Sequence, residues 1–305
     1  MARIHQMTIP EFEKAFPHEE ACQAYLVKHR WPNGEIVCPR CGRSEKVSAV
    51  STMPFKWQCY ACSPASGYRF SVIAGTIFEN TNKPLRDWFR VIHMMVTSKK
   101  GVSALQVQRV MGFGSYRTAW YMCHRVRAGL ADENFRKLMG IVEMDETFIG
   151  GELGNKHVSE RRRLRKEHGN RAGDVNKTIV AGAVERGGNV VARVVQNVSA
   201  EVLQQFVREA VSEKVSLICT DEWRAYDGLK SEFFHRSVVH KYGQYVIGAI
   251  HTQTIEGFWS LVKRGMAGTF HKVSAKYLPL YIAEFQWRYN NRQNADIFGA
   301  AVEAM

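Results

Sequence analysis

Hydrophobic and polar positions follow two different periods along the chain, and the period changes near residue 138. Before this point, residues 84–130 carry apolar groups at helical spacing with two glycine-containing breaks, which predicts three short helices. After it, short apolar runs of strand length dominate, and they cover residues 140–151, 177–186, 189–196, 215–221 and 236–240. Helices are predicted from Ser199 to about Glu213 and over 253–265 and 275–292. This order predicts an α/β domain over residues 138–295.

The part of the chain before residue 80 has two different patterns. Residues 1–34 predict a short helical segment, in which Thr8 caps a helix ahead of Pro10. Residues 35–75 are rich in Cys, Gly and Pro and contain short alternating runs, a pattern that predicts hairpins. Together with a helical region over residues 80–131, the pattern therefore predicts four parts.

Four of the seven cysteines form two CxxC pairs, Cys38 with Cys41 and Cys59 with Cys62. Seventeen residues separate the pairs, a spacing typical of a structural Zn²⁺ site with four thiolate ligands. Two redox-active pairs are the alternative, and they are disfavoured in a basic protein whose other cysteines are single. A closed four-cysteine site has no open coordination position, so the prediction is a zinc ribbon without catalytic chemistry.

The helical region contains the arrangement of a helix-turn-helix. Ser103 and Ser115 each precede a helix, and Gly112 and Gly114 form the turn between the two helices. The apolar residues of the second helix would face the other helices: Ala119, Met122, Cys123 and Val126. The residues expected nearer solvent are Tyr116, Arg117, Trp120, Arg125 and Arg127.

A helix of this kind binds in a DNA groove, so Tyr116, Arg117 and Arg125 are predicted to contact DNA. The alternative is an ordinary helical linker with solvated arginines.

Charge favours the same partner. The chain has 42 Lys and Arg against 29 Asp and Glu, a net charge of +13 and a pI near 9.5. A polyanion such as double-stranded DNA releases counterions when it binds such a protein. No apolar run reaches the roughly 18 residues of a membrane span, and the first residues lack the apolar stretch of a signal peptide. We therefore expect a cytoplasmic, nucleoid-associated protein with no membrane partner.

Three carboxylates occupy unusual positions. Two lie in apolar runs that would otherwise predict core strands, and the third lies near the start of a helix. Asp145 lies inside the first strand-like run, Asp221 ends a later one, and Glu256 begins a helix that carries Lys263 two turns further on. Taken singly, each could be a turn, cap or solvated residue. Their order matches an RNase H-like fold with a two-metal site for phosphoryl transfer, which would hold Mg²⁺ or Mn²⁺. Side-chain alternation puts Glu143 on the same face as Asp145, where a secondary group beside the metal could lie, but Glu143 is not counted among the predicted ligands.

The motifs also carry a family likeness. The chain resembles the ISXO-like insertion-sequence transposases in CPRCG and CYAC, VEMDETFIGG, CTDEWRAYDGL and HTQTIEGFWSLVKRG. The resemblance implies a zinc ribbon and a DDE catalytic domain of RNase H-like fold. It also implies that Asp145, Asp221 and Glu256 are the catalytic acids and that Lys263 lies near DNA phosphate. Some relatives have Asn as the third acid, whereas this chain has Glu256.

The expected activity is that of a DNA transposase. Such a protein binds the terminal inverted repeats of its element, cleaves a strand and joins the 3′ end to target DNA, and it is expected to act as a homodimer or higher oligomer. His251, Lys263 and Trp259 would position the DNA end, with core packing as the favoured role of Trp259. Support for the second acid is expected from Trp223, Arg224 and Tyr226. The alternatives are a transposase-derived DNA-binding regulator without catalysis and a structure-selective nuclease. The basic segment 152–176 is expected to be a solvated loop, with contact of its arginines to phosphate as the alternative.

Overall fold

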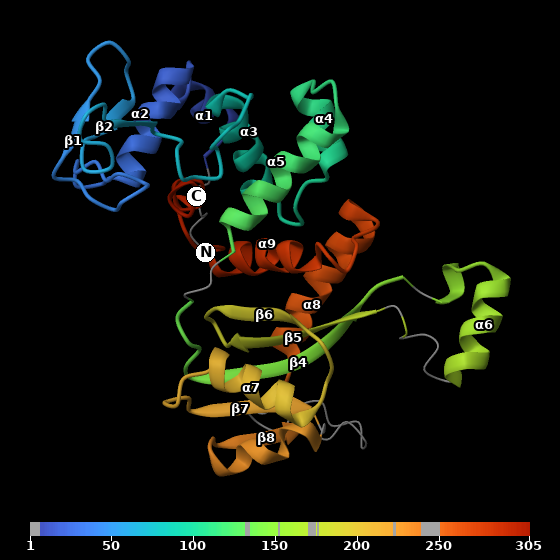
Figure 1. The fold of residues 1–305 in the computed structure, drawn as a ribbon. Helices are drawn as coiled ribbons and strands as arrows, with labels where there is room; N and C mark the ends of the chain where they lie inside the picture. Colours follow the sequence, from blue (N-terminus) through green and yellow to red (C-terminus); the bar gives the residue numbers. More distant parts are fainter. Residues whose placement is uncertain are drawn as a thin grey trace. The chain divides into compact units, whose positions relative to one another are not determined.

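A computed structural model describes residues 7–131, 135–151, 153–169, 175, 177–221, 224–238 and 251–305. The chain divides into two compact units (Figure 1). The first contains residues 1–130 together with 291–305, and the second contains residues 131–290. The last fifteen residues thus group with the N-terminal part, and the four-part division predicted from the sequence stays a prediction.

The first unit combines helices with a small three-stranded sheet. Its elements are α1 (Ile9–Ala15), α2 (Glu19–Arg30), β1 (Val47–Ala49), β2 (Lys56–Cys59), β3 (Tyr68–Ser71), α3 (Leu85–Thr97), α4 (Ala104–Met111), α5 (Tyr116–Gly129) and α10 (Ile297–Glu303). The predicted caps are confirmed, because Thr8 forms a capping box and the hydroxyls of Ser103 and Ser115 accept backbone N–H groups. Gly112 ends α4 in the left-handed conformation, with φ of 66°.

Helix α10, which the sequence patterns did not predict, completes the core of this unit. The ring of Phe298 lies 5.5 Å from those of Phe16 and Phe89 and 5.9 Å from those of Phe12 and Tyr25. Aromatic pairs at these distances contribute stabilisation beyond their buried area. The helix has only seven residues, too few for the helical period to stand out.

The second unit is built on a five-stranded sheet with the order β6-β5-β4-β7-β8. The strands are β4 (Ile141–Ile149), β5 (Thr178–Glu185), β6 (Val190–Val195), β7 (Leu217–Asp221) and β8 (His235–Val238). Strand β5 is antiparallel to β4 and β6, whereas β4, β7 and β8 run parallel. The predicted α/β character of this part of the chain is confirmed.

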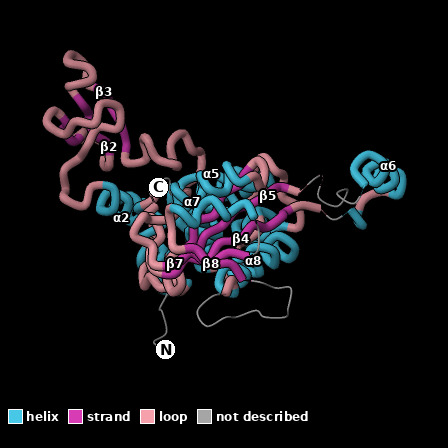
Figure 2. The backbone as a smooth tube through the Cα atoms, turned by 90° about the horizontal axis from the view of Figure 1, so that it is seen from below, coloured by secondary structure: helices cyan, strands magenta, loops and turns pink. Residues whose placement is uncertain are grey.

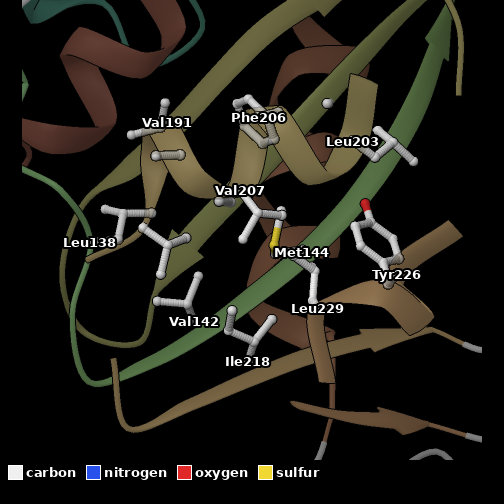
Figure 3. Packing of buried hydrophobic residues seen from close by; sticks show 14 residues of the cluster. Leu138, Val142, Met144, Val191, Leu203, Phe206, Val207, Ile218, Tyr226 and Leu229 are labelled. Atoms are coloured by element: carbon white, nitrogen blue, oxygen red, sulfur yellow. The ribbon is translucent and has the colours of Figure 1, made fainter. Parts of the chain in front are cut away.

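Helices cover both faces of the sheet. Helix α7 (Ala200–Ala210) and the 3-10 helix η3 (Arg224–Ser231) pack on one face, against Val142, Met144 and Ile218 (Figure 3). Helices α8 (Gln253–Gly265) and α9 (Leu278–Asn290) pack on the other; a π-helical turn, η5 (Met266–Phe270), follows α8. Because strand side chains alternate, Glu143 and Asp145 point to the α8 face.

The basic segment between β4 and β5 contains a helix, so the expectation of a loop over residues 152–176 was wrong. Helix α6 (Val158–His168) follows a 3-10 turn, η1 (Leu153–Asn155), and stands apart from the sheet (Figure 2). Arg, Lys and Glu are good helix formers, but Leu164 is its only buried residue, so no apolar period marks the helix. Among the described residues, no helix combines the length and apolar character needed to cross a membrane.

Candidate active site and metal centre

The four cysteines of the two CxxC pairs converge in the first unit. Their sulfur atoms all lie within 4.8 Å of one another, with 3.8 Å between Cys38 and Cys62 and 3.7 Å between Cys41 and Cys59. A tetrahedron with Zn–S bonds of about 2.3 Å has edges of about 3.8 Å, so the geometry fits zinc. The backbone N–H of Arg43 lowers the pKa of Cys41 to about 7, whereas burial raises the pKa of Cys62 to about 12 and also raises that of Cys38. These four residues would hold a structural Zn²⁺.

Asp145 and Asp221 lie on neighbouring parallel strands of the second unit. Glu143 pairs with Cys219 in the register of β4 and β7, and two further residues along each strand bring Asp145 beside Asp221. Both side chains therefore point to the face that α8 covers. This helix carries Glu256 in its first turn and Lys263 in its last. The fold thus gathers the three acids and the lysine from distant parts of the sequence.

Asp145 interacts electrostatically with the other three charged groups. Burial, together with the charges of Asp221 and Glu256, raises the pKa of Asp145 to about 6, against the opposing effects of the Glu146 backbone N–H and of Lys263. Neighbouring carboxylates offer the oxygen ligands that a hard divalent cation prefers. Asp145, Asp221 and Glu256 are the residues that would hold a magnesium or manganese ion, and this assignment stays a prediction.

Glu143 lies two residues before Asp145 and is fully buried. Its Oε2 accepts the backbone N–H groups of Thr254 at 2.7 Å and Ile255 at 3.1 Å, and its Oε1 accepts the Thr254 hydroxyl at 2.9 Å. A carboxylate in this position satisfies the free N–H groups of a helix start and interacts favourably with the helix dipole. Because donors surround both of its oxygens, Glu143 holds α8 rather than a metal.

Arg186 extends this contact. Its Nε donates to Glu143 Oε1 at 2.6 Å, and its Nη2 donates to the carbonyl oxygen of His251 at 2.9 Å. The Nδ1 atom of His251 lies 3.1 Å from Glu143 Oε1, and its side chain is 22% exposed. Sequence reasoning missed Arg186, which is one of many arginines in a basic chain. The role of His251 at DNA stays a prediction.

Glu146 points to the opposite face of β4, as alternation predicts, and meets Tyr226 there. The Tyr226 hydroxyl donates to Glu146 Oε1, which joins η3 to the strand that carries Asp145. Burial, followed by the charges of Asp145 and Asp221, raises the pKa of Glu146 to about 8. Of the residues expected to support the second acid, Trp223 lies outside the described residues, and Arg224 begins η3.

Trp259 packs against the sheet beside Asp145. Gly182 pairs with Asp145 in the register of β4 and β5, and a Cβ on Gly182 would meet the Trp259 ring atom Cη2 at 2.7 Å. The tryptophan is 3% exposed, which confirms the expected core packing. Glycine at this position allows α8 to approach the sheet closely at the site of the three acids.

The second helix of the predicted helix-turn-helix is α5. Ala119, Met122, Cys123 and Val126 are buried as expected, and Tyr116 and Arg117 are exposed. The expectation for Arg127 was wrong, because this residue is 1% exposed. It lies four and eight positions after Cys123 and Ala119, so helical spacing places it on their buried face.

Arg125 is half-buried, and its Nη1 donates to the carbonyl oxygen of Glu79 at 3.0 Å. DNA contacts by Tyr116, Arg117 and Arg125 stay predictions.

Comparison with known proteins identifies two domains in the chain. The chain matches the ISXO2-like transposase domain over residues 137–290, just over half of its length, and a transposase zinc-ribbon domain over residues 17–64. It is 28% identical over 281 residues to a protein in the transposable element ISH50 of Halobacterium salinarum, covering 90% of this chain and 92% of that protein. It is also 33% identical over 101 residues to a transposase-like protein of Haemophilus influenzae, covering 33% of this chain and 80% of the relative. The chain therefore belongs to the ISXO2-like transposase family.

Proposed function

We propose that this protein is a metal-dependent DNA transposase that binds the terminal inverted repeats of an insertion sequence, cleaves a strand there and transfers it to target DNA. The observation that carries the proposal is the convergence of Asp145, Asp221 and Glu256 beside Lys263. Three carboxylates from two strands and a helix are suited to phosphodiester chemistry with divalent ions. Family membership supports the same reaction class.

The proposed roles follow from where each group lies. Asp145, Asp221 and Glu256 bind Mg²⁺ or Mn²⁺, and the hydroxyl of Thr252 donates to Glu256 Oε1 at 3.0 Å and orients it. When bound, the metal activates the attacking oxygen and stabilises the leaving oxygen of an in-line displacement at phosphorus. Lys263 and His251 contact the DNA phosphates at the cut end, where Lys263 offsets negative charge.

The proposal extends to the fold and the partners. The sheet has the order β6-β5-β4-β7-β8, and β5 is the strand that runs antiparallel to its neighbours. This arrangement supports an RNase H-like fold for the second unit. We assign the binding of duplex DNA to α4 and α5, with the exposed Tyr116 and Arg117 and the half-buried Arg125 as contacts. Two element ends must be held together, so the active form is a dimer or higher oligomer at the nucleoid.

A strand-transfer assay tests the proposal. A labelled duplex that carries the inverted repeat is incubated with the protein and Mg²⁺, and cut and joined products are separated by size. We expect both products from the wild-type chain and neither from D145N, which should still shift the duplex in a gel.

A transposase-derived regulator would bind without cutting, and a structure-selective nuclease would cut without joining. Either pattern from the wild-type protein would overturn the proposal.

A further inference from the structure

Helix α6 separates its charges onto two sides. At about 100° per residue, Arg161, Arg162, Arg165 and Lys166 fall within an arc of about 140°. Glu160 and Glu167, seven positions apart, lie on the other side with the buried Leu164. One side of the helix therefore carries four cations and no carboxylate, with the exposed Val158 in its first turn, and we call these four cations the basic face.

The described residues give the cations of the basic face no carboxylate partner. Glu160 pairs with Lys156 at 2.7 Å, and Glu167 lies 4.0 Å from Arg163, outside the basic face. Within the described part of the chain, Arg161, Arg162, Arg165 and Lys166 form no ion pair. By contrast, Arg193 and Arg208 of the same unit pair with carboxylates at 2.5 and 2.7 Å.

We infer that the basic face of α6 binds the sugar-phosphate backbone of double-stranded DNA. Three guanidinium groups and an ammonium group on one helical surface complement a row of phosphates, since arginine can form two parallel hydrogen bonds to one phosphate. The alternating charges of an ordinary solvated helix would instead pair with one another at i, i+4 spacing. Contacts of this kind carry no sequence information, so α6 contributes affinity and register.

This inference rests on the proposed function only in taking DNA as the ligand. It adds a surface that neither α5 nor the three acids supply. The prediction is quantitative, because each phosphate neutralised by a basic side chain contributes about 0.9 to the slope of log Kobs against log salt concentration.

The experiment measures the binding of the full chain to a 30-base-pair duplex of mixed sequence by fluorescence anisotropy across a salt series. R161Q/R162Q/R165Q is expected to reduce the magnitude of the salt slope by about 2 to 3, because three phosphate contacts are lost. Glutamine is a good helix former, so α6 is expected to persist, which circular dichroism checks. If the triple variant does not fold, R162Q/R165Q replaces it, with an expected reduction of about 1.8.

A charge-balanced variant separates a contact from general electrostatics. R162Q/R165Q/E160Q/E167Q has the net charge of the wild-type chain but a weakened basic face, and it should lose the same slope as R162Q/R165Q. An unchanged slope in either arginine variant, or a normal slope in the charge-balanced one, overturns the inference. If the wild-type protein cleaves repeat DNA but the α6 variants have its salt slope, this inference is wrong and the proposed function is unaffected. An α6-dependent slope in a protein that never cuts would instead sink the proposed function.

Discussion

The carboxylate of Glu143 accepts the backbone N–H of Thr254 at 2.7 Å, across 111 residues of sequence. This bond joins the strand of Asp145 to the first turn of the helix of Glu256. The distance between Asp145 and Glu256 therefore depends on Glu143, which is not one of the three acids. It is a positioning contact, and it makes the geometry of the candidate metal site sensitive to a change in the core.

Replacing Glu143 with Gln should cost about 2–4 kcal/mol of unfolding free energy. The substituted amide group would face N–H donors and leave the Arg186 guanidinium without its carboxylate. Urea unfolding of the full chain measures the loss. The matched control is E209Q, which breaks the surface pair with Arg193 and should cost less than about 1 kcal/mol. Equal losses in the two variants would contradict the role assigned to Glu143.

Replacing Asp145 with Asn should stabilise the metal-free protein at neutral pH. The folded state raises the pKa of Asp145 from 3.8 to about 6, so it binds this proton more tightly than the unfolded state does. The unfolding free energy of the wild-type chain should therefore fall as pH rises from about 4 to 6, by at most about 3 kcal/mol from this group. D145N should lack this component.

Magnesium provides the internal control for that measurement. It should raise the melting temperature of the wild-type chain above pH 6 and leave D145N nearly unchanged, because the variant loses a ligand. A wild-type protein that magnesium does not stabilise would remove Asp145 from the metal site.

Replacing Gly182 with Ala should destabilise the second unit by about 1–3 kcal/mol, because the new methyl group would overlap the Trp259 ring. The double variant G182A/W259F should recover part of this loss, since phenylalanine lacks the outer ring in contact. The control is G257A: this glycine is exposed in α8, a Cβ added there would meet nothing within 4 Å, and the change should gain up to about 1 kcal/mol. No recovery in the double variant would indicate that the glycine has another purpose.

Removing zinc should expose four thiols to a thiol reagent. The zinc-loaded protein should react slowly with the reagent. After chelation, the protein should react at Cys38, Cys41, Cys59 and Cys62, and in urea it should react at all seven cysteines. Cys38 and Cys59 are buried, but the small ribbon around them would depend on the metal, whereas the three cysteines outside the ribbon are buried in α2, α5 and β7. Burial also raises the pKa of Cys22 to about 12. Mass spectrometry after alkylation identifies the sites, and early labelling of the ribbon cysteines without chelation would argue against a bound metal.

Sequence reasoning succeeded where one local rule decides the outcome. The CxxC spacing was enough to predict the four-sulfur cluster, because each pair is a short turn. The α/β character of the second unit and the face shared by Glu143 and Asp145 followed from apolar runs and side-chain alternation. These features depend on a few neighbouring residues.

It failed where packing between distant segments decides. The purpose of Glu143 depends on a helix start 111 residues away, which no local pattern encodes. Helix α6 has almost no apolar period, and α10 is too short to show one. Arg127 is the exception: its position four residues after Cys123 already put it on the buried face, so the error lay in giving its charge more weight than its spacing.

The placement of α10 in the first unit has a consequence for biosynthesis. Phe298 packs among rings contributed by residues 12–89, yet the ribosome makes it only after the entire second unit. The sheet of the second unit can therefore fold during translation before the core of the first unit is complete. A prematurely terminated chain would carry the three acids without the finished N-terminal core, so truncated products of this gene should be prone to proteolysis.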